Sequence, residues 1–333
     1  MWGGILVSVL FTYLTFRGTD FGALRAALGR SNYWTLIPAL VVLGVAFFLR
    51  AIRWRLLISP EHRPSTSIVT SALLVGYLFN SILPARAGEA IRIVIVRQRA
   101  GTPKFELLGT VVAERAIDVL TLLLFLFAIA PVIPSTEWLP RVVALGAVLF
   151  VVTAGVFIVF AVYGERPARV LLRPLGMLPM MSRDRIDLAA ANLVRGLSAF
   201  RRPAIAFPAF ALTAASWLLI AFASWICMRG FELRLGFSAA VLVVAAINLA
   251  MVLPSGPAGI GVFEAATLTA LHPFDIDRAQ GLSYALVLHG LNVVPFIVLG
   301  YLALQHHALV PGKRAPDGEA GAAAAERQTV SSS

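Results

Sequence analysis

Hydrophobic residues gather along the chain in long runs that short polar stretches separate. Five of these runs contain roughly 20 residues or more, enough for a helix to cross the roughly 30 Å hydrocarbon core of a bilayer. They cover residues 34–52, 106–133, 141–163, 204–228 and 281–304. The runs are too long, and alternate too little with polar residues, for the strands of a membrane β-barrel, which have about 10 residues. The pattern therefore predicts membrane-spanning α-helices.

Four shorter apolar runs form two pairs, and Pro and Gly interrupt the joint within each pair. The first pair covers residues 67–83 and 85–97, and the second covers 237–253 and 258–272. Each pair returns the chain to its starting side, whether it forms a re-entrant hairpin or two full spans. The two pairs open to opposite sides of the membrane. We therefore predict an all-α, polytopic integral membrane protein with two broken or re-entrant hairpins in an inverted repeat.

The remaining stretches set the domain boundaries. The run 2–16 has neither a basic start nor a clear small-residue cleavage site, so we interpret it as a retained first span. We predict a single transmembrane domain over residues 1–305 and a disordered cytoplasmic tail over 306–333, where Ala, Gly, Ser and charge cannot form a core. Within the long polar linker 164–203 we expect an amphipathic surface helix near 183–200.

Composition and charge favour a membrane partner. Of the 333 residues, 59% are hydrophobic and 14% are charged, whereas soluble domains carry about 25% charged residues. The net charge of +11 lies beside apolar runs, which favours an anionic lipid surface over nucleic acid. Basic residues concentrate in 50–66, 97–104 and 164–203, so the positive-inside rule predicts a multi-pass cell-membrane protein with both termini in the cytoplasm. The basic loop 17–33 does not fit this orientation.

The two joints repeat one pattern: Asn, apolar residues, Leu-Pro, a turn with Gly, and Glu near the start of a new helix. Its main members are Asn80, Pro84, Gly88 and Glu89 in the first joint and Asn248, Pro254, Gly259 and Glu264 in the second. Proline removes a backbone donor and glycine permits a sharp turn, so each helix should break there. At membrane depth such a break is tolerated only beside protein or a wet cavity. The new helix start presents N–H groups and a positive dipole end, which suit an anion such as phosphate.

Two groups of ionisable residues lie close to the first joint. They are Arg86, Glu89 and Arg92 in the first group and Glu114, Arg115 and Asp118 in the second. On helices, each group would place its charges on one face. Buried charges are costly unless they pair, so we expect the two groups to meet. We expect Arg115 to pair with Glu89 or Asp118, and Arg92 is the alternative partner of these two carboxylates.

Plainer interpretations remain open for several charged residues. The arginines from Arg86 onward could belong to a solvated loop. Three arginines near the end of the run 34–52 are interpreted as anchors that extend to the membrane interface. They are Arg50, Arg53 and Arg55. Glu264 could equally be a helix cap, and we interpret His289 and Asn292 first as helix–helix contacts.

Three motifs, in this order, resemble the lysylphosphatidylglycerol synthase transmembrane family, which is also described as flippase-like. They are Leu-Pro-Ala-Arg-Ala-Gly-Glu-Ala-Ile-Arg at 83–92, Glu-Arg-Ala-Ile-Asp at 114–118, and Leu-Pro-Ser-Gly-Pro-Ala-Gly-Ile-Gly-Val-Phe-Glu at 253–264. An Arg-Trp pair at 53–54 also fits, and the resemblance covers roughly residues 5–305. It implies lipid translocation, and because the best-known members carry an additional aminoacyl-transfer domain, we expect this chain not to make an aminoacyl lipid by itself. His289 departs from the resemblance, which implies an arginine in the last span.

These observations predict a flippase-like transporter that moves an anionic phospholipid or a polyprenyl- or hopanoid-type lipid-linked substrate between leaflets. The alternatives are a membrane enzyme and an accessory scaffold for lipid-modifying enzymes, one of which could be a partner. We expect no cofactor and no metal ion, because the histidines lie at no metal-ligand spacing and no P-loop is present. The predicted substrate-binding residues are Asn80, Pro84, Arg86, Glu89, Arg92, Glu114, Arg115, Asp118, Asn248, Pro254, Gly259 and Glu264.

Overall fold

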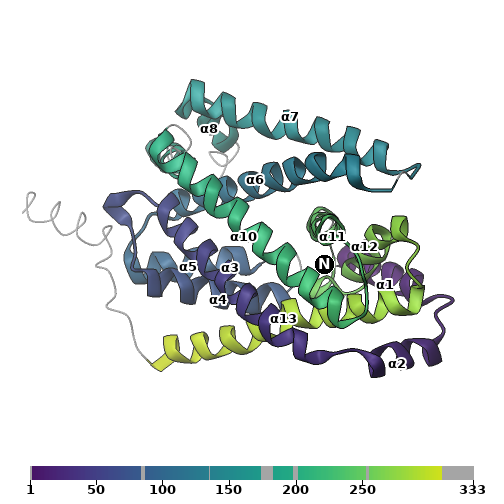
Figure 1. The fold of residues 1–333 in the computed structure, drawn as a ribbon. Coiled ribbons are helices and arrows are strands. Elements are labelled where there is room, and N and C mark those ends of the chain that lie inside the picture. The colour runs from purple at the N-terminus through teal and green to yellow at the C-terminus, as the bar shows by residue number, and fades with distance from the viewer. Residues whose placement is uncertain are drawn as a thin grey trace, which may run out of the picture.

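The fold was obtained as a computed structural model, and it is built from helices joined by short loops (Figure 1). The structure describes residues 2–83, 87–134, 136–173, 183–197, 202–252 and 255–309. Over these ranges every regular element is an α-helix or a short 3₁₀-helix, as the hydrophobic pattern predicts.

Within the described ranges, five helices are long and apolar enough to cross a membrane. They are α3 (Leu36–Leu57), α6 (Lys104–Ile129), α7 (Leu139–Tyr163), α10 (Pro203–Gly230) and α13 (Arg278–Leu309). Each coincides with one of the long predicted runs. The axes of α6, α7 and α13 run from left to right in Figure 1, and α3 and α10 cross them obliquely.

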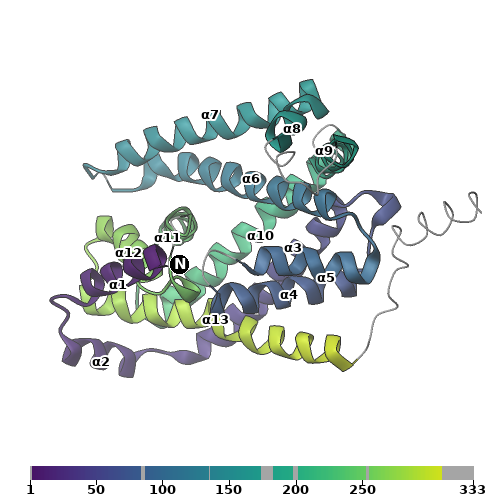
Figure 2. The ribbon, with the colours of Figure 1, turned by 180° about the vertical axis from the view of Figure 1, so that it is seen from behind.

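Each pair of shorter runs forms a helical hairpin. The first consists of α4 (Thr66–Ile82) and α5 (Gly88–Ala100), and the second of α11 (Phe237–Ala250) and α12 (Val262–Leu271). At about 1.5 Å per residue, these helices span roughly 15 to 26 Å, less than the roughly 30 Å of a hydrocarbon core. The first hairpin lies toward the end where α13 finishes, and α12 runs toward the other end (Figures 1 and 2).

The two hairpins pack reciprocally against the two halves of the chain. α3 packs along α10, while α4 packs on α13 and α11 packs on α6. Each hairpin therefore contacts the long helix that follows the other hairpin, while the inverted repeat itself stays a prediction. The approach of α4 to α13 is close, because a Cβ on Gly300 would lie 2.5 Å from the Leu74 carbonyl oxygen.

Three further helices of the described residues pack on these elements. α1 (Trp2–Phe16) packs on α12, and α8 (Glu165–Leu172) packs on α9 (Arg183–Leu197). The last helix confirms the predicted amphipathic segment near 183–200, and it lies against α6. Gly109 and Gly196 make this contact possible, because a Cβ on either would collide with backbone of the other helix.

Two boundaries differ from the sequence prediction. The loop 17–33 contains a helix that was not predicted, α2 (Phe21–Arg30), whose start is capped by the Asp20 carboxylate. The hydrophobic pattern missed it because it is short and polar enough to resemble a loop. α13 continues to Leu309, past the predicted domain end at 305. The predicted disorder of the tail stays a prediction, since residues 310–333 lie outside the described ranges.

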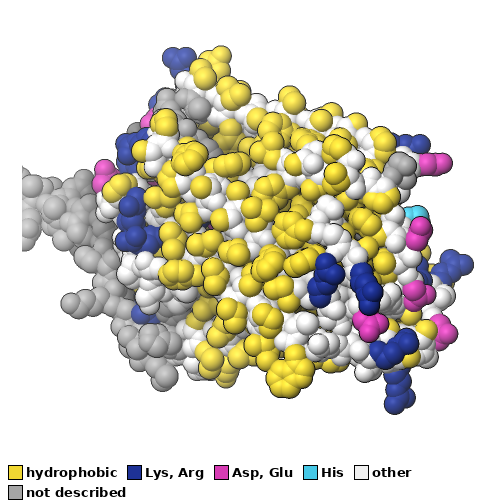
Figure 3. All heavy atoms as spheres, viewed as in Figure 1, with side chains coloured by type: hydrophobic (Ala, Val, Ile, Leu, Met, Phe, Trp, Pro, Cys, Tyr) yellow, Lys and Arg dark blue, Asp and Glu magenta, His cyan; other side chains and the backbone are white. Residues whose placement is uncertain are grey.

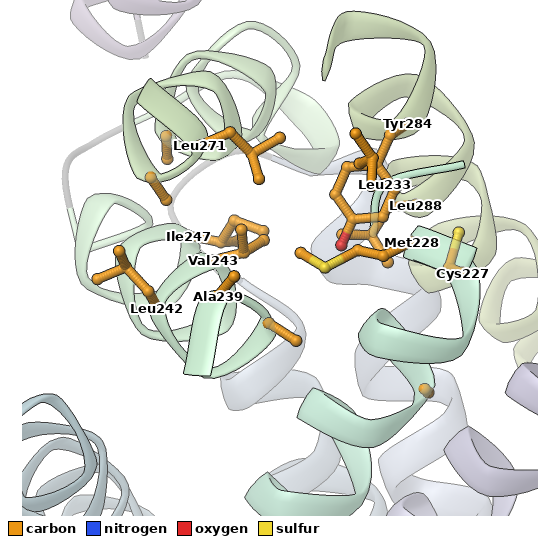
Figure 4. Packing of buried hydrophobic residues seen from close by; sticks show 14 of the residues in the cluster. Cys227, Met228, Leu233, Ala239, Leu242, Val243, Ile247, Leu271, Tyr284 and Leu288 are labelled. Carbon is orange, nitrogen blue, oxygen red and sulfur yellow. The ribbon is translucent and has the colours of Figure 1, made fainter. Parts of the chain in front are cut away.

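Packing and surface both fit a lipid environment. Buried apolar side chains of α10 to α13, such as Met228, Val243 and Leu288, interdigitate at the core of the bundle (Figure 4). Hydrophobic side chains also cover the middle of the outer surface, and most charged side chains lie toward its two ends (Figure 3). On α7, Leu145 is 71% exposed and Val151 is 68% exposed. Exposed apolar surface of this extent indicates contact with a membrane.

Candidate functional site

Arg53 lies at the centre of a buried ionic cluster between α3, α6 and α10. Its guanidinium donates to Asp118 Oδ1 and to Glu114 Oε1, each at 2.6 Å, and to Thr213 Oγ1 at 2.8 Å. The side chain is only 1% exposed. Both carboxylates project from α6 about 15 Å or more from its start, well inside the bundle. Three long helices are therefore joined by one guanidinium.

The first hairpin joins the same cluster through Arg92 of α5. Its guanidinium donates to the second oxygen of Glu114, Oε2, at 2.7 Å. It also lies 4.5 Å from the ring centroid of Trp54, whose indole N–H donates to Thr110 Oγ1 at 3.0 Å. Glu114 thus binds two arginines, one from α3 and one from α5, and holds the hairpin against both long helices.

Arg115 pairs with Glu89 and Asp118, as the spacing of the charges predicted. Its guanidinium lies 3.4 Å from Glu89 Oε1 and 3.8 Å from Asp118 Oδ2. The Arg115 side chain is 37% exposed, so this edge of the cluster is open. The predicted meeting of the two charged groups is confirmed by these pairs and by that of Arg92 with Glu114. Three arginines and three carboxylates balance in charge.

The interpretation of Arg50 and Arg53 as interface anchors is wrong, because Arg50 lines a cavity in the bundle and Arg53 is buried. α3 packs along α10 over much of its length, which turns position 53 into the bundle instead of toward lipid. The cost of burying this charge is offset by its two carboxylate partners. The sequence did contain a signal for this role of Arg53. Glu114 and Asp118, if both are buried on α6, need more than one buried cation as partners. Arg55, by contrast, donates to the Pro64 carbonyl oxygen near the end of α3.

A second buried pair joins α12 to α13. Glu264 Oε1 lies 2.6 Å from His289 Nδ1, and Oε2 accepts the backbone N–H of Gly261 at 2.8 Å. His289 Nε2 lies 3.1 Å from the Ala258 carbonyl oxygen, and its ring stacks on Phe263 at 4.3 Å. Both plain interpretations are confirmed, since Glu264 caps its helix and His289 makes a helix–helix contact.

A cavity of about 220 Å³ lies between the two halves of the chain. Its polar lining is Arg50, Tyr77, Trp217, Asn248, His289 and Asn292. These side chains come from α3, α4, α10, α11 and α13, so both hairpins and three long helices contribute. Both the first and the second half of the chain therefore form its wall.

Arg50 is the cation of this cavity. Its guanidinium donates to Tyr77 Oη at 3.1 Å and lies 4.2 Å from the ring centroid of Trp217. Its Nε and one terminal nitrogen are buried without a hydrogen-bond partner in the described part of the chain. The same part of the chain places no carboxylate in an ion pair with Arg50. The site therefore offers unused donors and a positive charge.

Comparison with known proteins matches residues 1–300 to the family described as the lysylphosphatidylglycerol synthase TM region. The chain belongs to this family. Family membership and the five long apolar helices establish an integral, multi-pass membrane protein. A stretch of 120 residues is also 30% identical to the glycosyltransferase AglD of Haloferax volcanii. That stretch is 36% of this chain, and the chain covers only 19% of the length of AglD.

The remaining predicted site residues lie in or near the two hairpins. Asn80 Oδ1 accepts the backbone N–H of Gly88 at 2.8 Å and so closes the first hairpin. Asn248 lines the cavity, and its amide donates to a carbonyl oxygen of its own helix. Gly259 has φ of 75° in the tip of the second hairpin, a conformation that glycine adopts readily. Pro84, Arg86 and Pro254 lie outside the described residues.

The Leu-Pro and Gly joints predicted helix starts as anion sites, and at each of them one backbone donor is already engaged. The N–H of Gly88 bonds to Asn80, and that of Gly261 bonds to Glu264. The cavity residues Arg50, Tyr77 and Trp217 were absent from the predicted site, because only tertiary packing brings them together. Within the described residues, no group of three or more His, Cys, Asp and Glu side chains could hold a metal ion.

Proposed function

We propose that this member of the family moves an anionic, phosphate-bearing lipid between the leaflets, with its head group bound at Arg50. The observation that carries the proposal is the pair of buried Arg50 nitrogens that have no partner and belong to a cavity-lining side chain. Arginine suits phosphate because its planar donors match two phosphate oxygens at once. A buried donor without a partner is costly, and an anion in the cavity would remove that cost.

The balance of charges supports Arg50 over the other arginines as the ligand. Arg53, Arg92 and Arg115 are neutralised by the three carboxylates around them. An added anion would have to displace those carboxylates, which hold α3, α5 and α6 together. Arg50 forms no ion pair with a carboxylate among the described residues. Asp118 acts on Arg50 electrostatically but is held by Arg53 and Arg115, so an anion could bind Arg50 without breaking the fold.

The position of the cavity supports movement between leaflets. Hairpins that approach the bundle from opposite ends, with a substrate site between two repeats, are typical of transporters that open alternately to each side. Tyr77 of the first hairpin and Asn248 of the second both line the cavity. A rocking motion of one half against the other would expose it to each leaflet in turn. The positive-inside rule favours a cytoplasmic location for the end that carries 50–66 and 97–104.

An enzymatic role is the second candidate, favoured by the similarity to a glycosyltransferase. An Asp-Ile-Asp sequence at 275–277 resembles the acidic pairs that bind metal ions in some transferases. Here, however, the carboxylate of Asp277 accepts the backbone N–H groups of Ala279 and Gln280 and so caps α13. This structural use favours transport, and an accessory role beside a lipid-modifying enzyme remains the third candidate.

Reconstitution into liposomes tests the proposal. The purified chain is placed in phosphatidylcholine vesicles with fluorescent phosphatidylglycerol, and leaflet exchange and covalent change of the lipid are both measured. Arg50→Gln should weaken apparent lipid affinity about tenfold to hundredfold, the loss of a charge-assisted hydrogen bond worth about 1.5–3 kcal/mol. Arg97→Gln is the control, because Arg97 is exposed at the end of α5.

The outcomes separate the three candidates. Leaflet exchange without covalent change, reduced in Arg50→Gln and normal in Arg97→Gln, supports the proposal. A new covalent lipid product would favour the enzyme, and neither exchange nor product would favour the accessory role. Normal exchange in Arg50→Gln would reject Arg50 as the head-group ligand.

A further inference from the structure

We propose that Glu264 and His289 together bind one exchangeable proton, and that this proton enters the cavity with the anionic head group. The inference deepens the proposed transport and rests on it, because it names the ion that accompanies the lipid. The two ring nitrogens of His289 both face oxygen atoms.

The number of protons in the pair follows from these contacts. A backbone carbonyl oxygen only accepts hydrogen bonds, so His289 Nε2 must carry a proton toward the Ala258 oxygen, 3.1 Å away. A second proton must lie between Nδ1 and Glu264 Oε1, which are 2.6 Å apart. That proton belongs to an imidazolium beside a carboxylate, or to a carboxylic acid beside a neutral imidazole. In both forms the pair has no net charge.

Release of one proton changes both the charge and the hydrogen bonds. A neutral imidazole has one N–H, so beside an ionised Glu264 it can donate to only one of its two oxygen partners. The pair then carries one negative charge, and one of the two hydrogen bonds is lost. The proton leaves through the cavity, which His289 lines. Glu264 is only 3% exposed and His289 7%, so the interior must compensate any change in their charge.

The charged and titratable groups around the cavity determine the coupling. α3 contributes Arg50, α4 contributes Tyr77, and α12 contributes Glu264 beside His289 of α13. The side chains that α10 and α11 contribute, including Trp217 and Asn248, do not titrate. With the proton bound, the net charge of Glu264 and the cavity-lining side chains is the single positive charge of Arg50, whose electrostatic neighbour Asp118 of α6 is itself paired with Arg53 and Arg115. After release it is zero, which weakens anion binding, and by linkage a bound anion favours proton uptake.

The proton is also linked to the tip of the second hairpin. The Ala258 oxygen belongs to a turn in which Ala258 has φ of 54° and Gly261 has φ of 84°. This turn packs on α4 of the first hairpin, and Gly261 lies against Thr12 of α1. Loss of the bond from His289 would free the turn at the contact between the two halves. Protonation would thus affect how the two halves of the chain are arranged, as well as the affinity for the head group.

The experiment compares leaflet exchange of fluorescent phosphatidylglycerol in liposomes between about pH 5 and pH 8, where histidines usually titrate. The wild-type rate should fall as pH rises, by at most about tenfold per pH unit for one linked proton. His289→Arg keeps a cation beside Glu264 but cannot release a proton, so its rate should not depend on pH. His272→Gln is the matched control at an exposed histidine and should keep the wild-type slope.

A second measurement does not depend on transport or on one variant. In weakly buffered detergent solution, binding of dihexanoyl phosphatidylglycerol should take up protons in the wild type but not in His289→Arg or Glu264→Gln. A pH-independent wild-type rate, or an equal slope in His289→Arg, would overturn the coupling while leaving the proposed transport intact. No lipid movement in the wild type at any pH would overturn the proposed function itself, and equal proton uptake in all variants would overturn this proton site.

Discussion

Arg50 lies over the indole ring of Trp217, 4.2 Å from its centroid, and this contact links the cavity to the ionic cluster. The N–H of the same indole donates to Asp118 Oδ1 at 3.1 Å. Asp118 is in turn bound to Arg53. One side chain therefore connects the cation that faces the cavity with the carboxylate that holds α3 against α6. An anion that binds Arg50 and shifts it would therefore also move the Trp217 ring, which lies between Arg50 and Asp118.

The two contacts of Trp217 can be separated by substitution. Trp217→Phe keeps an aromatic face for Arg50 but removes the donor to Asp118, which should cost about 1.5–3 kcal/mol of stability. Lipid affinity should change little, because the cation–π contact remains. Trp217→Leu should lower both stability and affinity. Thermal unfolding and lipid exchange measure the two effects, and equal loss of affinity in both variants would contradict the assignment.

Loss of Arg53 should be strongly destabilising. Arg53→Leu removes the main partner of Asp118 and one partner of Glu114, both less than 5% exposed. An unpaired buried charge costs about 3–5 kcal/mol, so the unfolding temperature in detergent should drop sharply. Arg53→Leu combined with Asp118→Leu should recover part of that loss. A single variant as stable as the wild type would mean that the carboxylates are solvated.

The two glutamates that bind arginine near the first hairpin should differ in their contribution to stability, because they differ in exposure. Glu114 is 2% exposed and accepts from two arginines, whereas the Glu89 side chain is 23% exposed and lies 3.4 Å from Arg115. Glu114→Gln should therefore cost several kcal/mol of stability, and Glu89→Gln less than about 1 kcal/mol. Chemical denaturation of both variants under one condition tests the order. Similar losses would show that the two sites are equally buried.

The tip of the first hairpin depends on Gly88. A Cβ at this position would overlap the Gly76 carbonyl oxygen, so Gly88→Ala must push α5 away from α4. We expect a loss of about 1–3 kcal/mol and weaker lipid exchange. Gly29→Ala is the control, since no atom lies within 4 Å of its added Cβ. Unfolding and exchange measurements would contradict the close contact if both variants behaved alike.

Much of the fold could be predicted because it follows from local pattern. The five long helices and the two hairpins appear in the lengths of the apolar runs and in the Leu-Pro and Gly joints. The pairing of Arg115 with Glu89 and Asp118 was also predictable, since charges in a membrane must find partners. α2 was missed because a short, moderately polar helix contains no distinctive run of apolar residues.

The sequence alone determined that this chain lies in a membrane, that its helices break twice, and that acidic and basic residues from 86–92 and 114–118 must compensate each other. These properties depend on the hydrophobicity of residues that are neighbours along the chain and on the cost of burying charge. Only the tertiary structure decided that Arg53 is central, that Arg50 lines a cavity with two unpartnered nitrogens, and that His289 meets Glu264. Which face of a helix meets which neighbour depends on packing between segments far apart in the chain, and no local pattern contains that information.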